Sequence, residues 1–408
     1  MLLFIKLAFR NLLRNKRRTF IAGTAIGIGL ASLIFTDALI IGMERNMIES
    51  ATDSFVGEAQ IHRSGFRQTY DVSEIIVDPA SVIAQLRQDS VVSHFAPRAI
   101  SFAMVTSPSN VNSVTMVGID PPRERYLSQI DDAITLGNYF EGDNPQDVVI
   151  GAKLAELLDL ALGSRIVLTV SQAKTGDLSQ ELFRVSGIYH LNIREMDEGM
   201  AFVRLPVAQR MLGIGDGIHE IAIRFSNINY SRNEDLPFWR QFSQNGNEAI
   251  GWPSLFPEMV AALDMSHFAT YILGVILFGV VALGIINTLF MSLHERMFEF
   301  GVLRAVGTRS TGMARLILLE AAALALLSIC LGAILGYAIT YIVMKTGINY
   351  AGIEFSGVTF RNLLYPVLNL KQFVIYPVAV FLFTVIVAFY PAIYAARMSP
   401  AEAMRRSF

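Results

Sequence analysis

The sequence predicts an α-helical membrane protein with four transmembrane helices and cytoplasmic N- and C-termini. A large α+β extracytoplasmic domain is expected between the first and second helices. Three observations predict this fold class: four long apolar blocks, basic residues gathered on one side of them, and one long polar insertion. Of the 408 residues, 53% are hydrophobic and 17% are charged. Soluble proteins carry about 25% charged residues, so the composition favours a membrane protein with a sizeable part in water.

Each apolar block is long enough to cross a bilayer, which takes about 20 helical residues. The predicted transmembrane helices cover residues 19–42, 268–293, 316–344 and 372–395. Asp37 near the end of the first and Glu320 near the start of the third are their only acidic residues. We expect both to reach the interface or to support a packing contact, because the second and fourth helices supply no charged partner for a proton relay.

Lys and Arg are concentrated in the cytoplasmic loops of membrane proteins. Thirteen basic residues lie in segments 1–18, 294–315 and 396–408, whereas segment 345–371 holds three. The first three segments are therefore predicted to be cytoplasmic, the N-terminal one as an amphipathic segment, and 345–371 is predicted to be a periplasmic loop. The first apolar block exceeds the about 7–15 residues of a signal-peptide core, so we expect an uncleaved anchor.

Residues 43–267 are polar and acidic overall and should form the inserted domain. Short apolar or alternating runs at 147–150, 165–170, 183–189 and 218–225 predict strands, and 82–87 and 153–160 predict helices. Residues 171–180 join two of these strands, and a plain hairpin connection is the simplest interpretation.

Several signatures of chemistry are missing from the sequence. It contains no G-x-x-x-x-G-K-[ST] phosphate loop, no C-x-x-C and no H-E-x-x-H. Its six histidines do not cluster, and the single cysteine, Cys330, lies in an apolar run. We therefore expect no catalytic residue, no metal site and no cofactor in this chain.

The segment after the second apolar block carries the sharpest functional signal. Its apolar residues Phe298, Val302, Leu303 and Val306 fall on one helical face, while its charged residues remain available to water. Gly307 then supplies a helix stop. A solvated connector is the alternative, but a connector needs only a few residues. An amphipathic cytoplasmic helix joined to two membrane helices can be pushed by a partner.

Three motifs resemble those of the FtsX-like permease family, which includes MacB-type exporters and lipoprotein-releasing permeases. They are residues 8–18 (AFRNLLRNKRR), 295–307 (ERMFEFGVLRAVG) and 390–405 (YPAIYAARMSPAEAMR). The resemblance implies a permease subunit, with ATP and Mg bound by a separate cytoplasmic ABC ATPase in two copies. It also implies that 294–315 contains a coupling helix that docks into this ATPase. The implied coupling residues are Glu295, Arg296, Glu299, Phe300, Gly301, Val302, Leu303, Arg304 and Gly307.

The inserted domain resembles that of LolC/LolE-type permeases in the order of short motifs such as 117–121 (VGIDP), 149–155 (VIGAKLA) and 185–189 (VSGIY). These permeases extract lipoproteins from the bacterial inner membrane and pass them to a periplasmic carrier. The resemblance implies a second permease copy or a paralogue, a lipoprotein cargo, contact with membrane lipid, and a carrier; it implies no nucleic acid.

Two sets of residues are candidates for contact with these partners. The residues that could line a cavity for acyl chains are Ile34, Phe35, Leu39, Ile40, Ile272, Val275 and Phe278. The loop that could hold a carrier contains Lys174, Thr175, Gly176 and Asp177. Two alternatives stay open: a MacB-like efflux permease for peptides or amphiphiles, and an FtsX-like non-transporting regulator of periplasmic enzymes.

Overall fold

The computed structural model describes residues 10, 14, 16–140, 142–349, 354–355, 358–359 and 363–397. The chain divides into two compact units. One, here called the helical unit, comprises Met1–Arg45, Leu263–Asn349 and Leu363–Phe408. The other, here called the α+β domain, comprises Asn46–Ala262 and Tyr350–Asn362.

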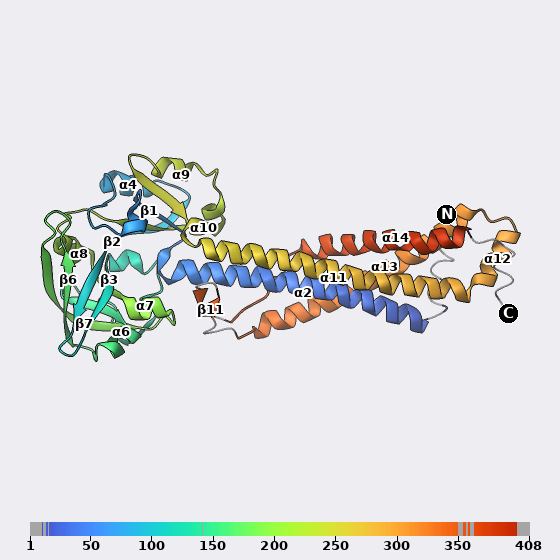
Figure 1. Ribbon diagram of the computed structural model, residues 1–408, viewed down its shortest axis with the longest axis horizontal. Helices are drawn as coiled ribbons and strands as arrows, with labels where there is room; N and C mark the ends of the chain where they lie inside the picture. Colours follow the sequence, from blue (N-terminus) through green and yellow to red (C-terminus); the bar gives the residue numbers. More distant parts are fainter. Residues whose placement is uncertain are drawn as a thin grey trace. The chain divides into compact units, whose positions relative to one another are not determined.

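Four long helices dominate the helical unit and run side by side in Figure 1. They are α2 (Lys16–Ala51), α11 (Pro257–Glu295), α13 (Ser310–Thr346) and α14 (Gln372–Arg397). Each is long and apolar enough to cross a membrane. The α11 helix begins at Pro257, within the stretch predicted as domain, because proline is well suited to a first helical position and the helical pattern then continues unbroken.

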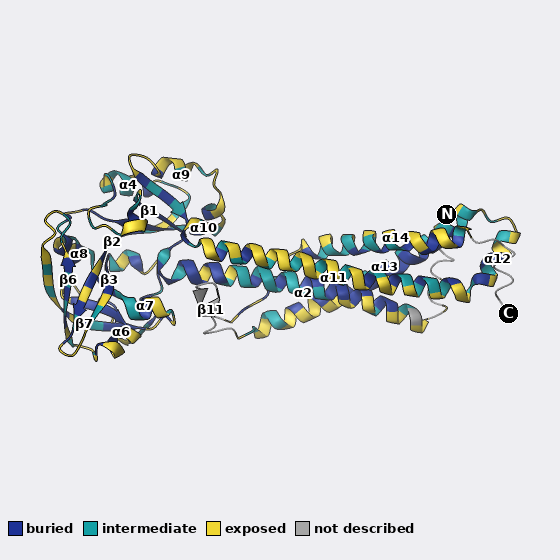
Figure 2. Cartoon of the chain, viewed as in Figure 1, coloured by how far each residue is buried: buried dark blue, intermediate teal, exposed yellow. Residues whose placement is uncertain are grey.

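Small residues bring α2 and α13 into close contact. A Cβ atom on Gly332 would lie only 2.7 Å from the carbonyl oxygen of Gly27, and one on Gly336 would lie 3.2 Å from the Cα of Ala31. Such residues allow two membrane helices to approach at backbone distance. Within the most apolar 18-residue stretch of each helix, 50% of the residues of α2 and 44% of those of α13 are buried. The corresponding shares are 11% for α11 and 17% for α14. Exposed residues therefore line much of α11 (Figure 2).

A ten-stranded mixed sheet forms the framework of the α+β domain. The strands are β1 (Ala59–Arg63), β2 (Val92–Thr106), β3 (Val111–Ile119), β4 (Ile134–Gly137), β5 (Asp147–Gly151), β6 (Arg165–Ser171), β7 (Leu178–Tyr189), β8 (Met200–Arg204), β9 (Glu220–Phe225) and β10 (Asn247–Gly251). Their order is β10-β1-β9-β2-β3-β8-β5-β7-β4, and β6 pairs with both β2 and β7. Six strands, β2, β3, β8, β5, β7 and β6, therefore close into a ring. Only the β3–β8 and β5–β7 pairs are parallel.

Short helices cover this sheet. They are α3 (Phe66–Thr69), α4 (Pro79–Leu86), α5 (Pro121–Glu124), α6 (Ala152–Leu157), α7 (Arg194–Gly199), α8 (Leu205–Leu212), α9 (Pro237–Phe242), α10 (Trp252–Leu255) and the 3-10 helix η2 (Ile228–Arg232). A separate two-stranded piece pairs β11 (Glu354–Phe355) with β12 (Val358–Thr359).

Both faces of the sheet centre are buried. Val203 of β8 packs in a core with α6 and α8, whereas Phe202 faces a second core that includes Phe55. Phe55 belongs to η1 (Thr52–Val56), a π-helical turn that directly follows α2. A strand covered on both sides is apolar almost throughout, as β5 is with all five residues buried.

The predicted fold class is confirmed: four long apolar helices, with a mixed α+β domain between the first and the second. The four predicted strands lie within or overlap β5, β6, β7 and β9, and the two predicted helices overlap α4 and α6. Most of the predicted N-terminal segment 1–18, nearly all of the tail 396–408, and several residues of loop 345–371 lie outside the described residues.

Candidate functional site

The connection between α11 and α13 contains a short separate helix, α12 (Met297–Ala305). The path of α11 breaks at Arg296, whose φ of −114° and ψ of 16° are not helical. At the other end, Gly307 has a φ of +103°, which only glycine adopts without strain. The two breaks define α12 as an element distinct from the long helices on either side.

One face of α12 packs into the helical unit. Met297 and Phe300 are buried in a cluster that includes Leu316 of α13 and Ala392 of α14. On the other side of α12, three apolar residues of the helix and Val306 at its C-terminal end remain exposed around Glu299. We call these the α12 patch: Phe298, Val302, Leu303 and Val306, with exposures of 51%, 40%, 40% and 83%. A grouped apolar surface outside the lipid core is typical of a docking site.

Ion pairs hold α12 in place. The Arg296 Nε lies 3.1 Å from Glu299 Oε2, and its Nη1 lies 2.7 Å from Glu320 Oε1 on α13. Glu299 Oε1 also accepts a 2.7 Å hydrogen bond from Nη1 of Arg14. These four residues, here called the Arg296 cluster, connect the N-terminal segment, α12 and α13. The Arg296 guanidinium also lies over the Phe300 ring, at 5.1 Å.

The surroundings of Glu299 and Arg296 favour the charged form of each. Partial burial favours a neutral Glu299, but hydrogen bonds and charges from Arg14 and Arg296 outweigh it and hold the carboxyl pKa below its ordinary value. Burial likewise lowers the pKa of Arg296, but the two glutamates outweigh it and raise that pKa. Glu299 and Arg296 are therefore paired as ions near neutral pH.

The predicted coupling residues do not all lie on the same side of α12. Phe300 and Gly301 face inward, whereas Val302 and Leu303 belong to the exposed patch. Glu295 is the last residue of α11, and the Arg304 guanidinium donates to the Ser310 hydroxyl at the start of α13.

Two members of the Arg296 cluster were not among the predicted coupling residues. Arg14 belongs to the first of the three motifs, residues 8–18, and its place in that motif is the sequence signal that could have identified it. Glu320 lies 24 residues from its partner Arg296, and no local periodicity connects the two.

The seven predicted cavity residues are not gathered around one space in the described part of this chain. Ile34 is fully buried against Gly336 of α13, and Phe278 stacks edge-on with Phe383 of α14 at 4.9 Å. Ile272 and Val275 instead point outward from α11, with exposures of 47% and 73%. The remaining three, Phe35, Leu39 and Ile40, are half-buried on α2.

Asp37 has a packing role within the helical unit. Its Oδ2 accepts a 2.8 Å hydrogen bond from the Gln372 side chain at the start of α14. Nearby, the backbone N–H of Val367 donates to the carbonyl of Ala38 at 2.8 Å. A Cβ on Gly42 would lie 2.2 Å from the carbonyl oxygen of Tyr365, so only glycine fits there. These contacts attach the segment before α14 to α2.

The predicted carrier loop is a compact hairpin turn between β6 and β7. Residues 172–177 span it, Ser171 pairs with Leu178 at its base, and Gly176 adopts a φ of +72°. Lys174, Thr175, Gly176 and Asp177 are all exposed. The described residues include no group of three or more His, Cys, Asp or Glu side chains able to hold a metal ion.

Comparison with known proteins agrees with this architecture. Residues 19–229 match the MacB-like periplasmic core domain, and residues 271–400 match the FtsX-like permease C-terminal region. The lipoprotein-releasing system transmembrane protein LolE of Haemophilus influenzae is 25% identical over 78% of this chain and 79% of its own. The corresponding LolC of Xylella fastidiosa is 21% identical over 99% of this chain and 98% of its own.

Among solved structures, the periplasmic region of MacB from Actinobacillus actinomycetemcomitans covers 48% of this chain and 89% of its own, with 13% identity and a TM-score of 0.34. The two family matches together include parts of all four membrane helices and most of the extracytoplasmic domain between the first two, with residues 230–270 lying between the matches. The chain therefore belongs to the FtsX-like permeases with a MacB-like periplasmic core domain, and is an ABC transporter permease subunit that works with a partner ATPase.

Proposed function

We propose that this permease transmits the work of ATP hydrolysis from its partner ATPase, through α12, to the extracytoplasmic domain, and that this work extracts lipoproteins from the bacterial inner membrane. The observation that carries the proposal is the α12 patch, four exposed apolar side chains on and at the end of a helix that the Arg296 cluster clamps to the membrane helices. A partner that binds the patch pushes on α13 directly, because Arg296 ties α12 to Glu320.

Clamping matters for transmission of force. A flexible connector would absorb the movement of a docked partner, whereas α12 is held by a buried apolar face and by ion pairs. Glu320 is only 6% exposed, so its pair with Arg296 is shielded from competing water. The predicted coupling residues thus take two roles in this proposal: Val302 and Leu303 contact the ATPase, and Arg296 and Phe300 hold the helix.

The choice of cargo is supported by the LolE and LolC relatives, whose names describe lipoprotein release. The physical need for coupled work is clear for such cargo. Each acyl CH₂ group withdrawn from a bilayer costs about 0.8 kcal/mol, so a lipid anchor does not leave spontaneously. ATP and Mg would be bound by the ATPase, expected in two copies, and not by this chain.

A second permease, identical or paralogous, is part of the proposal. The α11 helix exposes most of its surface, and a Cβ on Gly279 or Gly284 would meet nothing within 4 Å. Small residues on an open helix face suit close packing against another helix. Ile272 and Val275 of α11, together with the half-buried Phe35, Leu39 and Ile40 of α2, would then contact acyl chains between the two permeases. Ile34 is too deeply buried for this role.

A periplasmic carrier would receive the cargo. The exposed β6–β7 turn with Lys174, Thr175, Gly176 and Asp177 is the proposed contact point. The turn is held by bonds within it, such as the one from the Asp177 N–H to the Thr175 hydroxyl at 3.2 Å, and by the Ala173 N–H, which donates to the Leu212 carbonyl of α8 at 2.9 Å. The turn would therefore meet a carrier as a preformed surface.

The experiment is co-purification of the ATPase with the full-length permease, followed by ATP-driven release of a lipoprotein from proteoliposomes. We expect V306D, and more strongly the F298D/V306D pair, to lose the ATPase and the release together. The matched control is V111D, which places the same charge at a 58% exposed valine of β3 in the extracytoplasmic domain, outside the proposed carrier turn. Full ATPase recovery with F298D/V306D would refute docking at the α12 patch.

The same proteoliposomes distinguish the cargo. Release of lipoprotein supports extraction. Transport of peptides or amphiphiles without lipoprotein release would establish the efflux alternative, and ATPase binding with neither activity would refute both kinds of transport and leave the regulator of periplasmic enzymes as the alternative to test.

A further inference from the structure

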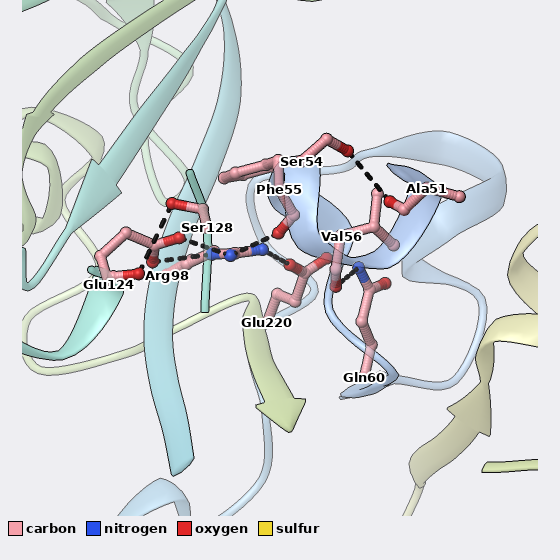
Figure 3. A network of polar contacts seen from close by, with 9 residues as sticks. All are labelled: Ala51, Ser54, Phe55, Val56, Gln60, Arg98, Glu124, Ser128 and Glu220. Atoms are coloured by element: carbon pink, nitrogen blue, oxygen red, sulfur yellow. Dashed lines mark hydrogen bonds and ion pairs between the residues drawn. The ribbon is translucent and has the colours of Figure 1, made fainter. Parts of the chain in front are cut away.

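The first membrane helix ends inside the extracytoplasmic domain in an unusual way. Helix α2 passes at Ala51 into the π-helical turn η1, which then turns at Gly57 with a φ of +82° into strand β1. The last carbonyls of a helix have no partner within it and must find one elsewhere. Here the domain supplies the partners, as Figure 3 shows.

The central partner is Arg98, in the middle of strand β2. Its Nη2 donates to the Phe55 carbonyl of η1 at 2.6 Å, and its guanidinium lies 3.8 Å from the centre of the Phe55 ring. Gln60 of β1 adds a second bond, from its Nε2 to the Val56 carbonyl at 3.0 Å. The end of α2 is thereby bonded to side chains from two strands of the sheet.

Arg98 is itself held from both sides of β2. Glu124 of α5 accepts two hydrogen bonds from Arg98, one from Nε at 3.1 Å and one from Nη2 at 2.6 Å. Glu220 of β9 accepts one from Nη1 at 2.8 Å. Glu220 lies directly opposite Arg98 in the register of the two strands. We call Phe55, Arg98, Glu124 and Glu220 the Arg98 cluster.

The Arg98 cluster is closed to water. The Arg98 and Glu124 side chains are 0% exposed and that of Glu220 is 6% exposed. Burial alone would lower the pKa of Arg98, but the charges and hydrogen bonds of the two glutamates outweigh it and raise that pKa, so the guanidinium stays charged. Its bidentate pair with Glu124 fixes its plane, which gives the bond to the Phe55 carbonyl a defined direction.

A weaker contact holds the same turn from outside. Asp53 of η1 pairs with Arg224 of β9 at 2.5 Å, but both side chains are about one-third exposed. Water competes for such a pair. Among the described contacts of η1, the Arg98 cluster is the buried attachment that combines charge, direction and a backbone acceptor.

We propose that Arg98 is a positioning residue that fixes the end of the first membrane helix to the centre of the extracytoplasmic sheet, so that movement of α2 reaches strand β2 and is not absorbed in the π-helical turn. The inference rests on the proposed function, which supplies the movement. It makes η1 the joint at which the domain receives that movement.

The first test is hydrogen exchange, followed by mass spectrometry, on the full-length permease in nanodiscs. R98M leaves two buried carboxylates unpaired and can unfold the domain, so the deciding variant is R98M/E124L/E220L, an apolar replacement of the whole charged set. We expect exchange of the amides in residues 52–58 to rise about tenfold to a hundredfold, as for the loss of one charged hydrogen bond, with β5 and β7 unchanged. The matched control is R63Q, which removes a half-exposed pair with Glu74 elsewhere in the domain.

The second test separates positioning from folding. In the complex with its ATPase, the triple variant should still hydrolyse ATP, while the ATP-dependent change in exchange at β2 is lost. Unchanged exchange at residues 52–58, equal loss of protection throughout the sheet, or a retained response of β2 to ATP would each overturn the proposal. These outcomes are independent of the α12 patch, whose failure would appear as full ATPase recovery with F298D/V306D.

Discussion

The Arg98 and Arg296 clusters use the same chemistry in opposite surroundings. In each, one arginine serves two glutamates and lies over a phenylalanine ring. The extracytoplasmic cluster is closed to water, with Arg98 at 0% exposure. In the cytoplasmic cluster, exposure to water increases from the inner to the outer residues. The Arg296 side chain is 12% exposed, that of Glu299 is 41% exposed and that of Arg14 is 63% exposed.

Because of this difference in water access, we expect the Arg98 cluster to be a fixed attachment and the Arg296 cluster to be an adjustable one. A buried ion pair loses much free energy when one partner is removed, because the other charge stays unpaired in a medium of low polarity. An exposed pair is replaced by water at little cost. The domain end of α2 is therefore built as a permanent attachment, and the α12 end as a clamp whose outer part can rearrange when a partner docks.

The largest expected effect is that of R98M on the stability of the extracytoplasmic domain. The substitution should lower its free energy of unfolding by about 3–5 kcal/mol, because Glu124 and Glu220 remain buried without their cation. Both tryptophans, Trp239 and Trp252, belong to this domain, so selectively excited tryptophan fluorescence during denaturation reports on it. R98M/E124L/E220L should recover most of the loss. A single-variant loss below about 1 kcal/mol would remove the contrast with exposed pairs.

A smaller effect is expected for E320Q on the helical unit. Glu320 and Arg296 are mostly buried but lie beside the open part of their cluster, so loss of one charged hydrogen bond should cost about 1.5–3 kcal/mol. Circular dichroism during unfolding in mixed micelles measures this cost, and exposed Arg315 provides the control R315Q. An effect as large as that of R98M would show that both clusters are equally rigid.

Acid should affect the two regions at different pH. Burial lowers the pKa of His219 below its ordinary 6.5, and the ring accepts a hydrogen bond from the Ile100 N–H at 3.0 Å, which requires an unprotonated Nδ1. The unfolded chain then binds the proton more readily, so the domain loses stability as the pH falls below about 6.5. Glu299 has a lowered pKa in the folded protein, so the stability that its pairing contributes is present above the ordinary 4.5 and is lost as the pH falls from there through the lower folded pKa.

Tryptophan fluorescence across a pH series measures the domain effect. Wild-type stability should fall as the pH drops below about 6.5, and H219Q should flatten this dependence. An identical pH profile in wild type and H219Q would contradict the role of this histidine.

The smallest effect is expected for R14Q. Arg14 is 63% exposed, so its pair with Glu299 should contribute at most about 1 kcal/mol and should weaken with salt. Unfolding of the helical unit at low and high ionic strength tests this. A loss larger than that of E320Q would reverse the assignment of the inner and outer parts of the Arg296 cluster.

Part of the candidate site could be predicted because its signal is local. The alternation of apolar and charged residues in 294–307 is a helical period, and Gly307 marks its end, so α12 follows from neighbours in the chain. The inward position of Phe300 and Gly301 did not follow, because which face packs depends on Leu316 and Ala392. Ile34 likewise reads as one more apolar membrane residue until Gly336 is found against it.

The sequence by itself determined the four membrane helices, the side of the membrane expected for each loop, and the family motifs, because length, hydropathy and basic flanks act over neighbouring residues. The tertiary structure decided which charges become attachments. Arg98 meets partners 26 and 122 residues away, and Arg296 meets one 24 residues away. Whether such a charge is exposed or buried and paired depends on strands and helices brought together only by folding.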